Sequence, residues 1–326
     1  MNVATRRVRR PRVGMGPPRE AVPASGLPWH RDVRRNWPLY VMALPGVLSI
    51  LIFGYGPLLG LVVAFKDYDP FLGILNSPWV GLDNFHQAFA NPYFWTAARN
   101  SVTIGILKLA VGFPSAIILA LLLNEVRARW LKSVVQTATI MPFFMSWVVA
   151  AVMFQNLLAP DGAVNGVLQH GLGRQPVSFL SDPITFLWVV VLQDTWKYAG
   201  YYAVLYLAAM SAIDPVLYEA SEVDGANRWQ QTWHITLPGI RSTMVTLFVL
   251  LVGYLVSAGF EQIYIMYNPS VYASTDIIET FSLRLAFQQG SYGLATAIGL
   301  CQASISLALV LVVNFLVKLF NQEGLF

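Results

Sequence analysis

Six long apolar runs, separated by polar segments, dominate the sequence. Each run is longer than the roughly 20 residues that an α-helix needs to cross the hydrocarbon core of a bilayer. This pattern predicts an all-α, polytopic membrane protein with six transmembrane helices. The predicted spans are 38–65, 102–123, 134–158, 184–212, 242–267 and 292–317.

The composition supports this fold class. Hydrophobic residues make up 56% of the 326 residues, charged residues make up 12%, and the mean hydropathy is +0.55. Soluble domains contain about 25% charged residues. The one cysteine, Cys301, lies within an apolar run, which excludes a disulfide framework and a cysteine-based zinc motif. The sequence has no G-x-x-x-x-G-K-[ST] phosphate-binding loop, so we expect any ATP hydrolysis to come from a partner.

The segment before the first span is basic. Residues 1–37 contain nine arginines and five prolines and show no apolar periodicity. We therefore predict an Arg-rich cytoplasmic tail without regular structure over 1–37 and a transmembrane domain over 38–326. Anionic lipid headgroups are the expected contact of such a tail. A nucleic-acid-binding arm is the weaker alternative beside a membrane helix. No cleavable signal peptide is predicted, because no short apolar region with a cleavage site follows the arginines.

Basic residues are distributed unequally between the loops. Fifteen Lys and Arg side chains lie in the N-terminal tail, the 124–133 loop, the 214–241 segment and the C-terminus, whereas the other loops contain four. Loops rich in Lys and Arg remain on the cytoplasmic side of a membrane. Both termini and the loop 214–238 are therefore predicted to be cytoplasmic.

The loop 214–238 has the pattern of two short helices joined by a turn. Asp214 is a suitable N-cap for the first helix. Gly225 can supply the turn, because glycine tolerates the left-handed conformation that ends a helix. Trp229 and Trp233 lie one turn apart on the second helix and share a face. Exposed carboxylates and a tryptophan stripe at a membrane surface indicate an element that docks on another protein.

This loop resembles the EAA loop of ATP-driven (ABC-type) importer permeases, in which an EAA triplet is followed by a glycine and then by I-x-L-P. Ser221 replaces the second alanine of the triplet, a change between small residues that preserves close packing. The resemblance implies that the loop couples a permease to an ATPase subunit. An ordinary hairpin between two membrane helices is the alternative. The matching positions are Glu219, Ala220, Ser221, Asp224, Gly225, Ala226 and Pro238.

The resemblance extends from about residue 38 to the end of the chain. Segments such as KDYDPFLGILNSPWVGLDNF, QTATIMPFFMSWVV and GFEQIYIMYNPSVY are similar to those of permeases for complex and polysaccharide-derived sugars, and within that group to the first permease subunits of alginate importers. The family implies a heterodimer of two related permeases, two ATPase subunits that use ATP and Mg²⁺, and a periplasmic or extracellular solute-binding protein. It also implies a multi-pass protein of the bacterial inner membrane that is not an enzyme and binds no cofactor or metal.

Few ionisable groups are predicted to lie inside the membrane, where they are costly and often mark a transport path. Asp194 and Lys197 lie three residues apart in the fourth span and can pair on one helical face. Lys108, in the second span, has no carboxylate within one helical turn. It must therefore find a partner on another helix, reach water by snorkelling, or meet a substrate. The functional interpretation is that both lysines line a cavity for a polyanionic sugar.

The fourth span also concentrates aromatic side chains. Their rings can stack on sugar faces, and tyrosine hydroxyls and a glutamine amide can form hydrogen bonds with sugar hydroxyls. Packing in the membrane core is the alternative for any single ring. The candidate substrate-path residues are Lys108, Gln193, Asp194, Lys197, Tyr198, Tyr201, Tyr202 and Glu261.

These patterns together predict the transmembrane permease subunit of an ATP-driven, binding-protein-dependent importer of oligo- or polysaccharide. We expect an acidic substrate such as an alginate-like uronate oligomer, because a bare lysine at mid-membrane costs about 2.5–3.5 kcal/mol and needs compensation. Neutral oligosaccharides are the alternative for the same importer class. A membrane enzyme acting on lipid-linked sugars and a secondary transporter are alternatives of other classes, but neither explains the EAA pattern.

Overall fold

A computed structural model describes residues 29–319, and the side chains of residues 36–319. Between residues 29 and 319 the secondary structure is helical, apart from one isolated bridge between Lys66 and Trp79, which confirms the all-α fold class. The first helix, α1 (Trp29–Ser49), begins inside the segment predicted to lack regular structure. The remainder of that predicted tail lies outside the described residues.

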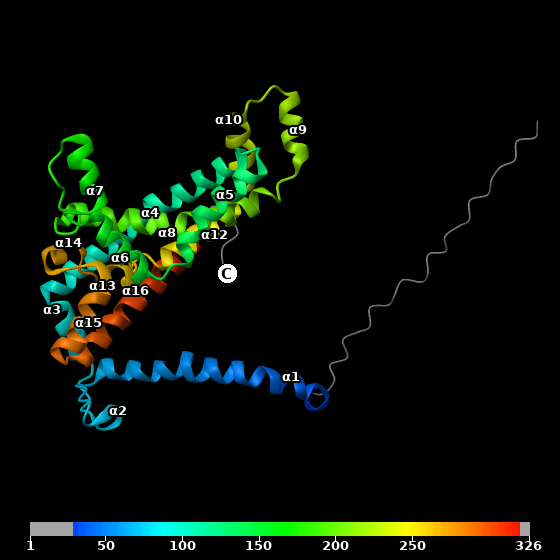
Figure 1. Ribbon diagram of the computed structural model, residues 1–326. Coiled ribbons are helices and arrows are strands. Elements are labelled where there is room, and N and C mark those ends of the chain that lie inside the picture. The colour runs from blue at the N-terminus through cyan, green and yellow to red at the C-terminus, as the bar shows by residue number, and fades with distance from the viewer. Residues whose placement is uncertain (1–28, 320–326) are drawn as a thin grey trace, which may run out of the picture. The chain divides into compact units, whose positions relative to one another are not determined.

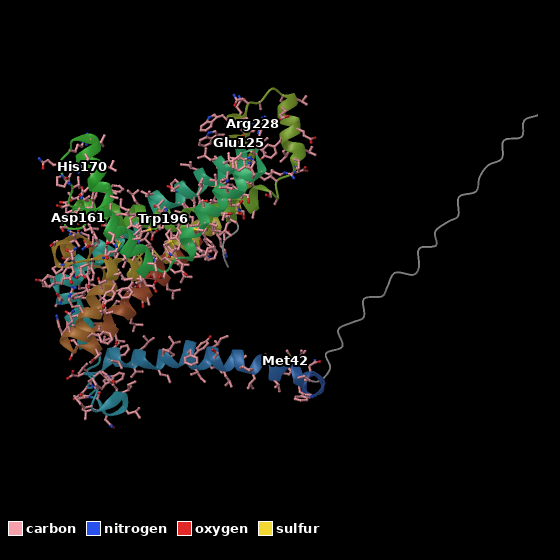
Figure 2. All side chains as sticks on the ribbon, viewed as in Figure 1. Met42, Glu125, Asp161, His170, Trp196 and Arg228 are labelled. Carbon is pink, nitrogen blue, oxygen red and sulfur yellow. The ribbon has the colours of Figure 1, made fainter. Side chains whose placement is uncertain are left out.

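The chain divides into two compact units, with the boundary between Leu59 and Gly60. The first unit contains α1 and the irregular helical turns that follow it. Its apolar side chains are exposed, as Met42 illustrates (Figure 2). The stretch Asn36–Phe65 is long and apolar enough to cross a membrane. An apolar surface of this kind suits contact with lipid or with another membrane subunit.

Two long helices, α4 (Pro92–Glu125) and α8 (Pro183–Met210), pack along each other at the centre of the second unit (Figure 1). Asn91 and Asp182 cap these helices, because their side-chain oxygens accept hydrogen bonds from backbone N–H groups of the first turn. Hydrogen bonds from the hydroxyl and backbone N–H of Thr185 also lower the pKa of the Asp182 carboxyl. Each helix begins with a proline, whose missing N–H has no cost at this position.

Shorter helices surround this central pair. Their bounds are α2 Gly73–Asn76, α3 Asp83–Ala90, α5 Arg129–Ile140, α6 Trp147–Leu158, α7 Ala163–Gly166, α9 Pro215–Val223, α10 Arg228–Gln231, α11 Leu237–Gly239, α12 Arg241–Gly253, α13 Phe260–Met266, α14 Tyr272–Thr275, α15 Ile278–Gln289 and α16 Tyr292–Leu319. Helices α9 and α10 lie at one end of the central pair, and α3, α14 and α15 lie at the other (Figure 1).

The number of transmembrane helices agrees with the prediction of six. Among residues 29–319, four helical stretches are long and apolar enough to cross a membrane, and two bent helix pairs raise the number to six. In one pair α8 bends by 74° into α9, and in the other Arg228–Gly239 bends by 61° into α12. The two bends flank the loop 214–238.

Two of the predicted spans, 134–158 and 242–267, are broken near the middle. The first break, between α5 and α6, contains the tight turn Met141–Phe144 and ends at Ser146, which caps α6. The second break, between α12 and α13, contains Ala258 and Gly259 in the left-handed conformation, with φ of 50° and 83°. The apolar pattern by itself does not place such breaks, because hydropathy records only how apolar a segment is.

Two glycines allow these breaks to approach the long helices closely. A Cβ atom on Gly105 of α4 would lie 2.0 Å from the carbonyl oxygen of Leu255, at the second break. A Cβ atom on Gly200 of α8 would lie 2.0 Å from the carbonyl oxygen of Thr139, just before the first break. Both neighbours are backbone atoms, so these two positions accommodate glycine but no larger residue.

Replacing Gly200 by alanine is expected to destabilise the protein, because the added methyl group meets the backbone of α5. Overpacking of this kind costs about 1–3 kcal/mol. The thermal unfolding midpoint of the purified chain should therefore fall by several degrees. Gly299→Ala, on α16, is the matched control, because a Cβ atom there has no neighbour within 4 Å. Equal midpoints for the two variants would contradict the close contact between α8 and α5.

Candidate functional site

The loop between α8 and α12 folds into the two short helices that the sequence predicts. Asp214 caps α9, since its Oδ1 accepts a hydrogen bond from the N–H of Val216 at 3.0 Å. Gly225 has a φ of +79°, which is favourable for glycine and strained for other residues. Asn227 and Gln230 form a reciprocal capping box at the start of α10. Local hydrogen bonds thus give the loop a defined shape.

Ser221 joins the two short helices of this loop. Its hydroxyl donates to the carbonyl oxygen of Tyr218 at 2.8 Å and accepts from Nε2 of Gln231 at 3.0 Å. An alanine could form neither hydrogen bond. The departure from the EAA triplet therefore has a structural role that the sequence alone does not show.

The outer surface of the loop combines carboxylates with indole rings. Glu219 and Asp224 are exposed, and the exposed rings of Trp229 and Trp233 meet edge to face with centroids 5.8 Å apart. Such a surface offers both charged and apolar contacts to a partner. Of the other predicted loop residues, Ala220, Gly225 and Pro238 are exposed, whereas Ser221 and Ala226 are partly buried.

An ion pair connects this loop to the end of α4. Nη1 of Arg228 lies 3.3 Å from Oε2 of Glu125 (Figure 2). The two side chains are 60% and 48% exposed, so the pair contributes at most about 1 kcal/mol to stability. Its effect is to orient α10 against α4.

A cavity of about 330 Å³ lies between α4, α8 and the second break. Four of the eight predicted substrate-path residues line it, namely Lys108, Asp194, Tyr198 and Tyr202. The others, Gln193, Lys197, Tyr201 and Glu261, do not line it. The structure therefore brings half of the predicted set together and gives the other half different surroundings.

Lys108 is 9% exposed, and its ammonium group donates hydrogen bonds to two protein acceptors and forms an ion pair with a third group. Nζ lies 2.6 Å from Oε1 of Gln262, 2.8 Å from the carbonyl oxygen of Ala258 and 3.0 Å from Oδ1 of Asp194. Of the three partners expected for this lysine, the structure shows the first, an acceptor on another helix. The Ala258 carbonyl lies at the second break, so Lys108 also satisfies backbone that the break leaves free.

Lys197 plays the corresponding role at the first break, and it does not form the pair with Asp194 that their spacing allows. No ion pair between these two side chains occurs in the described part of the chain, because Asp194 pairs with Lys108. The break brings backbone carbonyl oxygens to the Lys197 ammonium group instead. Its Nζ donates hydrogen bonds to the carbonyl oxygens of Pro142 (3.2 Å), Phe143 (3.3 Å) and Met145.

These contacts give both lysines partners within the protein, whereas the functional interpretation places both of them on a cavity for a polyanionic sugar. Lys197 donates hydrogen bonds to three backbone carbonyl oxygens, and Lys108 donates two hydrogen bonds and pairs with the Asp194 carboxylate. The cost of burying each cation is offset within the protein by charge pairing and hydrogen bonds. Buried lysines by themselves therefore give no reason to expect an acidic substrate.

The aromatic residues of α8 divide between cavity lining and helix packing. Tyr198 and Tyr202 line the cavity, whereas Tyr201 stacks on Phe143 with ring centroids 4.2 Å apart and ring planes 9° apart. Trp147, at the start of α6, also lines the cavity, although the sequence analysis does not select it. Only the break before α6 places this ring beside α8, and the break is not visible in the apolar pattern.

Two buried amides extend the polar cluster away from the cavity. Nε2 of Gln262 donates to Oε1 of Gln193 at 2.8 Å and to the carbonyl oxygen of Val190 at 2.9 Å. Gln193 is therefore part of a structural network, and Glu261 is exposed. Within residues 29–319, His, Cys, Asp and Glu side chains form no group of three that could hold a metal ion.

Comparison with known proteins identifies the family. Residues 112–323 match the family described as the binding-protein-dependent transport system inner membrane component. The chain belongs to this family. The matched residues include the loop 214–238, the whole of α8 and both broken spans. The loop and the cavity are thus both parts of a permease.

The permease is similar to individual proteins whose names state the transport system to which they belong. It is 42% identical over 288 residues to the polygalacturonan/rhamnogalacturonan transport system permease protein YteP of Bacillus subtilis (strain 168), covering 88% of this chain and 90% of that protein. It also matches a chain of a bacterial ABC transporter involved in the import of the acidic polysaccharide alginate, with 38% identity, a TM-score of 0.82 and coverage of 89% and 98%.

A further structure is that of a bacterial alginate ABC transporter in complex with an alginate pentasaccharide-bound periplasmic protein. The permease matches one of its chains with 38% identity and a TM-score of 0.82, covering 90% of this chain and 99% of that chain. These matches confirm the ABC importer permease fold and the resemblance to alginate-importer permeases. The family places the chain in the inner membrane.

Replacing Lys197 by glutamine is expected to destabilise the permease, because carbonyl oxygens at the first break lose their donor. Each buried polar group left without a partner costs about 1–3 kcal/mol. The thermal unfolding midpoint should fall well below that of Lys318→Gln, a matched change at an exposed position near the end of α16. If both variants unfold at the same temperature, Lys197 does not hold the break.

Proposed function

We propose that the permease is a transmembrane subunit of an ATP-driven importer of acidic oligosaccharides such as uronate oligomers. The observation that carries this proposal is the identity of 42% and 38%, over most of the chain, to two permeases whose transport systems are named for galacturonan and alginate. Both names denote polymers that contain uronate units. The proposal rests on these relatives and not on the buried lysines.

The proposed assembly contains a second related permease, two ATPase subunits and a solute-binding protein outside the bacterial inner membrane. A binding protein is supported by the alginate transporter that was solved with its periplasmic protein. In this assembly ATP and Mg²⁺ are used by the ATPase subunits, and this chain binds no cofactor. Membrane lipids surround its apolar faces, and both termini are cytoplasmic.

The loop 214–238 is proposed as the contact with an ATPase subunit. Its support is an exposed, well-ordered surface that lies at the end of two spans and carries Glu219, Asp224 and the tryptophan pair. Glu219 can pair with a basic residue of the ATPase, and Gly225 fixes the angle between the two short helices. A rigid loop of this kind can transmit the movement of a partner directly to α8 and α12.

The cavity is proposed as part of the sugar path. Tyr198, Tyr202 and Trp147 offer aromatic faces on which the C–H surfaces of a sugar can lie. Asp194 offers a carboxylate that can accept hydrogen bonds from sugar hydroxyls. An amphipathic ligand such as a sugar suits this combination of apolar walls and a few polar groups.

Neutral oligosaccharides are the second candidate substrate. The specific observation in their favour is that Asp194 pairs with Lys108, so the charge of this lysine is balanced within the protein. In a complex that imports acidic sugars, the compensating positive charge would then come from another subunit.

The substrate class can be tested with the assembled transporter in proteoliposomes. We expect ATP-dependent and binding-protein-dependent uptake of a labelled uronate oligomer, with a neutral oligomer of equal length close to background. Uptake of the neutral oligomer alone would refute the acidic substrate. Failure to accumulate any oligosaccharide, with ATP and the binding protein present, would refute the importer function.

Replacing Gly225 by valine should uncouple ATP hydrolysis from uptake, because a β-branched residue disfavours the left-handed conformation by roughly 1–2 kcal/mol. We expect the complex to assemble, uptake to fall about tenfold or more, and ATPase activity to lose its stimulation by the loaded binding protein. The matched control is Gly173→Val, since Gly173 has a φ of +60° and similarly open surroundings but lies outside the loop. Unchanged uptake by Gly225→Val would exclude a coupling role for the turn.

A further inference from the structure

The ion pair between Lys108 and Asp194 is asymmetric. Lys108 is 9% exposed and donates hydrogen bonds to Ala258 and Gln262, whereas Asp194 is 20% exposed and uses Oδ1 for the pair. In the described part of the chain no hydrogen bond reaches Oδ2 of Asp194. Both residues line the cavity. Asp194 is therefore the more exposed member of an ion pair on the cavity wall.

Asp194 is also the first member of a polar and aromatic stripe on α8. Asp194, Tyr198 and Tyr202 lie four residues apart on one helical face, and all three line the cavity. The stripe places an acceptor for hydroxyl groups beside two rings that can cover the C–H faces of a sugar. This arrangement matches the hydroxyl-bearing side of a sugar unit better than its carboxylate.

We propose that Asp194 determines the charge selectivity of this cavity: it cancels the charge of Lys108 and offers Oδ2 to a substrate hydroxyl. Lys108 is the positioning residue, because its ion pair holds the Asp194 carboxylate and its hydrogen bond to the Ala258 carbonyl holds the second break. The inference rests on the proposed oligosaccharide function and specifies how this subunit contributes to it. A uronate carboxylate is repelled at this point of the path and must face another part of the assembly.

Removing one charge or the other is expected to change the affinity for a uronate oligomer in opposite directions. Asp194→Asn keeps the shape of the side chain and leaves the Lys108 cation without its counter-charge, so an anionic ligand should bind more tightly. Lys108→Gln leaves the Asp194 carboxylate unbalanced, so the same ligand should bind more weakly. A purely structural ion pair would make both variants change binding in the same direction.

The experiment measures the dissociation constant of a uronate oligomer, and of its carboxyl-reduced neutral counterpart, for the assembled transporter in nanodiscs without binding protein. For the uronate oligomer we expect Asp194→Asn to lower the dissociation constant by about threefold or more and Lys108→Gln to raise it by a similar factor. The double variant should return close to the wild-type value. For the neutral oligomer, Asp194→Asn should raise the dissociation constant, because a hydroxyl loses its charged acceptor.

The control is Asp161→Asn, which removes an exposed carboxylate outside the cavity (Figure 2) and should change neither constant. Shifts in the same direction for Asp194→Asn and Lys108→Gln, equal shifts for both oligomers, or no measurable binding to the wild type would overturn the inference. If the transporter with Lys108→Gln does not assemble, the dissociation constants of the two oligomers for Asp194→Asn test the inference by themselves. A wild-type importer that takes up no uronate oligomer would instead refute the proposed function.

Discussion

The structure depends on two buried ammonium groups that satisfy backbone carbonyls at breaks in two membrane spans. In a bilayer, a backbone group freed by a broken helix finds no water and must be satisfied by protein. Lys197 supplies donors to three carbonyl oxygens at the first break, and Lys108 supplies one to Ala258 at the second. Without these donors each break would leave uncompensated polar groups in an apolar environment. Both lysines lie on the central helices α4 and α8, so the central pair holds both broken spans.

A glycine accompanies each lysine. Gly105 and Lys108 lie three residues apart on α4, and Lys197 and Gly200 lie three apart on α8. Each glycine permits backbone of a broken span to come close, and each lysine then reaches its carbonyl oxygens. Close approach and hydrogen bonding depend on one another, because a Cβ atom at either glycine would push the span beyond the reach of the ammonium group.

The breaks also create the cavity. Trp147 lines the cavity because a new helix, α6, begins at this residue after the first break. The turn at Gly259 forms another part of the cavity wall. Helix α12 runs between the second break and the loop 214–238. The two ends of one helix thus carry the surface proposed to receive movement from the ATPase and the wall of the proposed sugar path. Asp194 lies between these elements, where its pairing with Lys108 sets the charge of the cavity.

The sequence by itself determined the fold class, the number of spans and the form of the loop 214–238. These features follow from local patterns: long apolar runs, the cap at Asp214 and the left-handed turn at Gly225. Only the tertiary structure decided the partners of the buried charges. Asp194 could pair with Lys197 one turn away, yet it pairs with Lys108 on another helix. The physical reason is that hydropathy records where a segment is buried, whereas the acceptors of a buried ammonium group depend on which backbone the packing of distant helices brings to it.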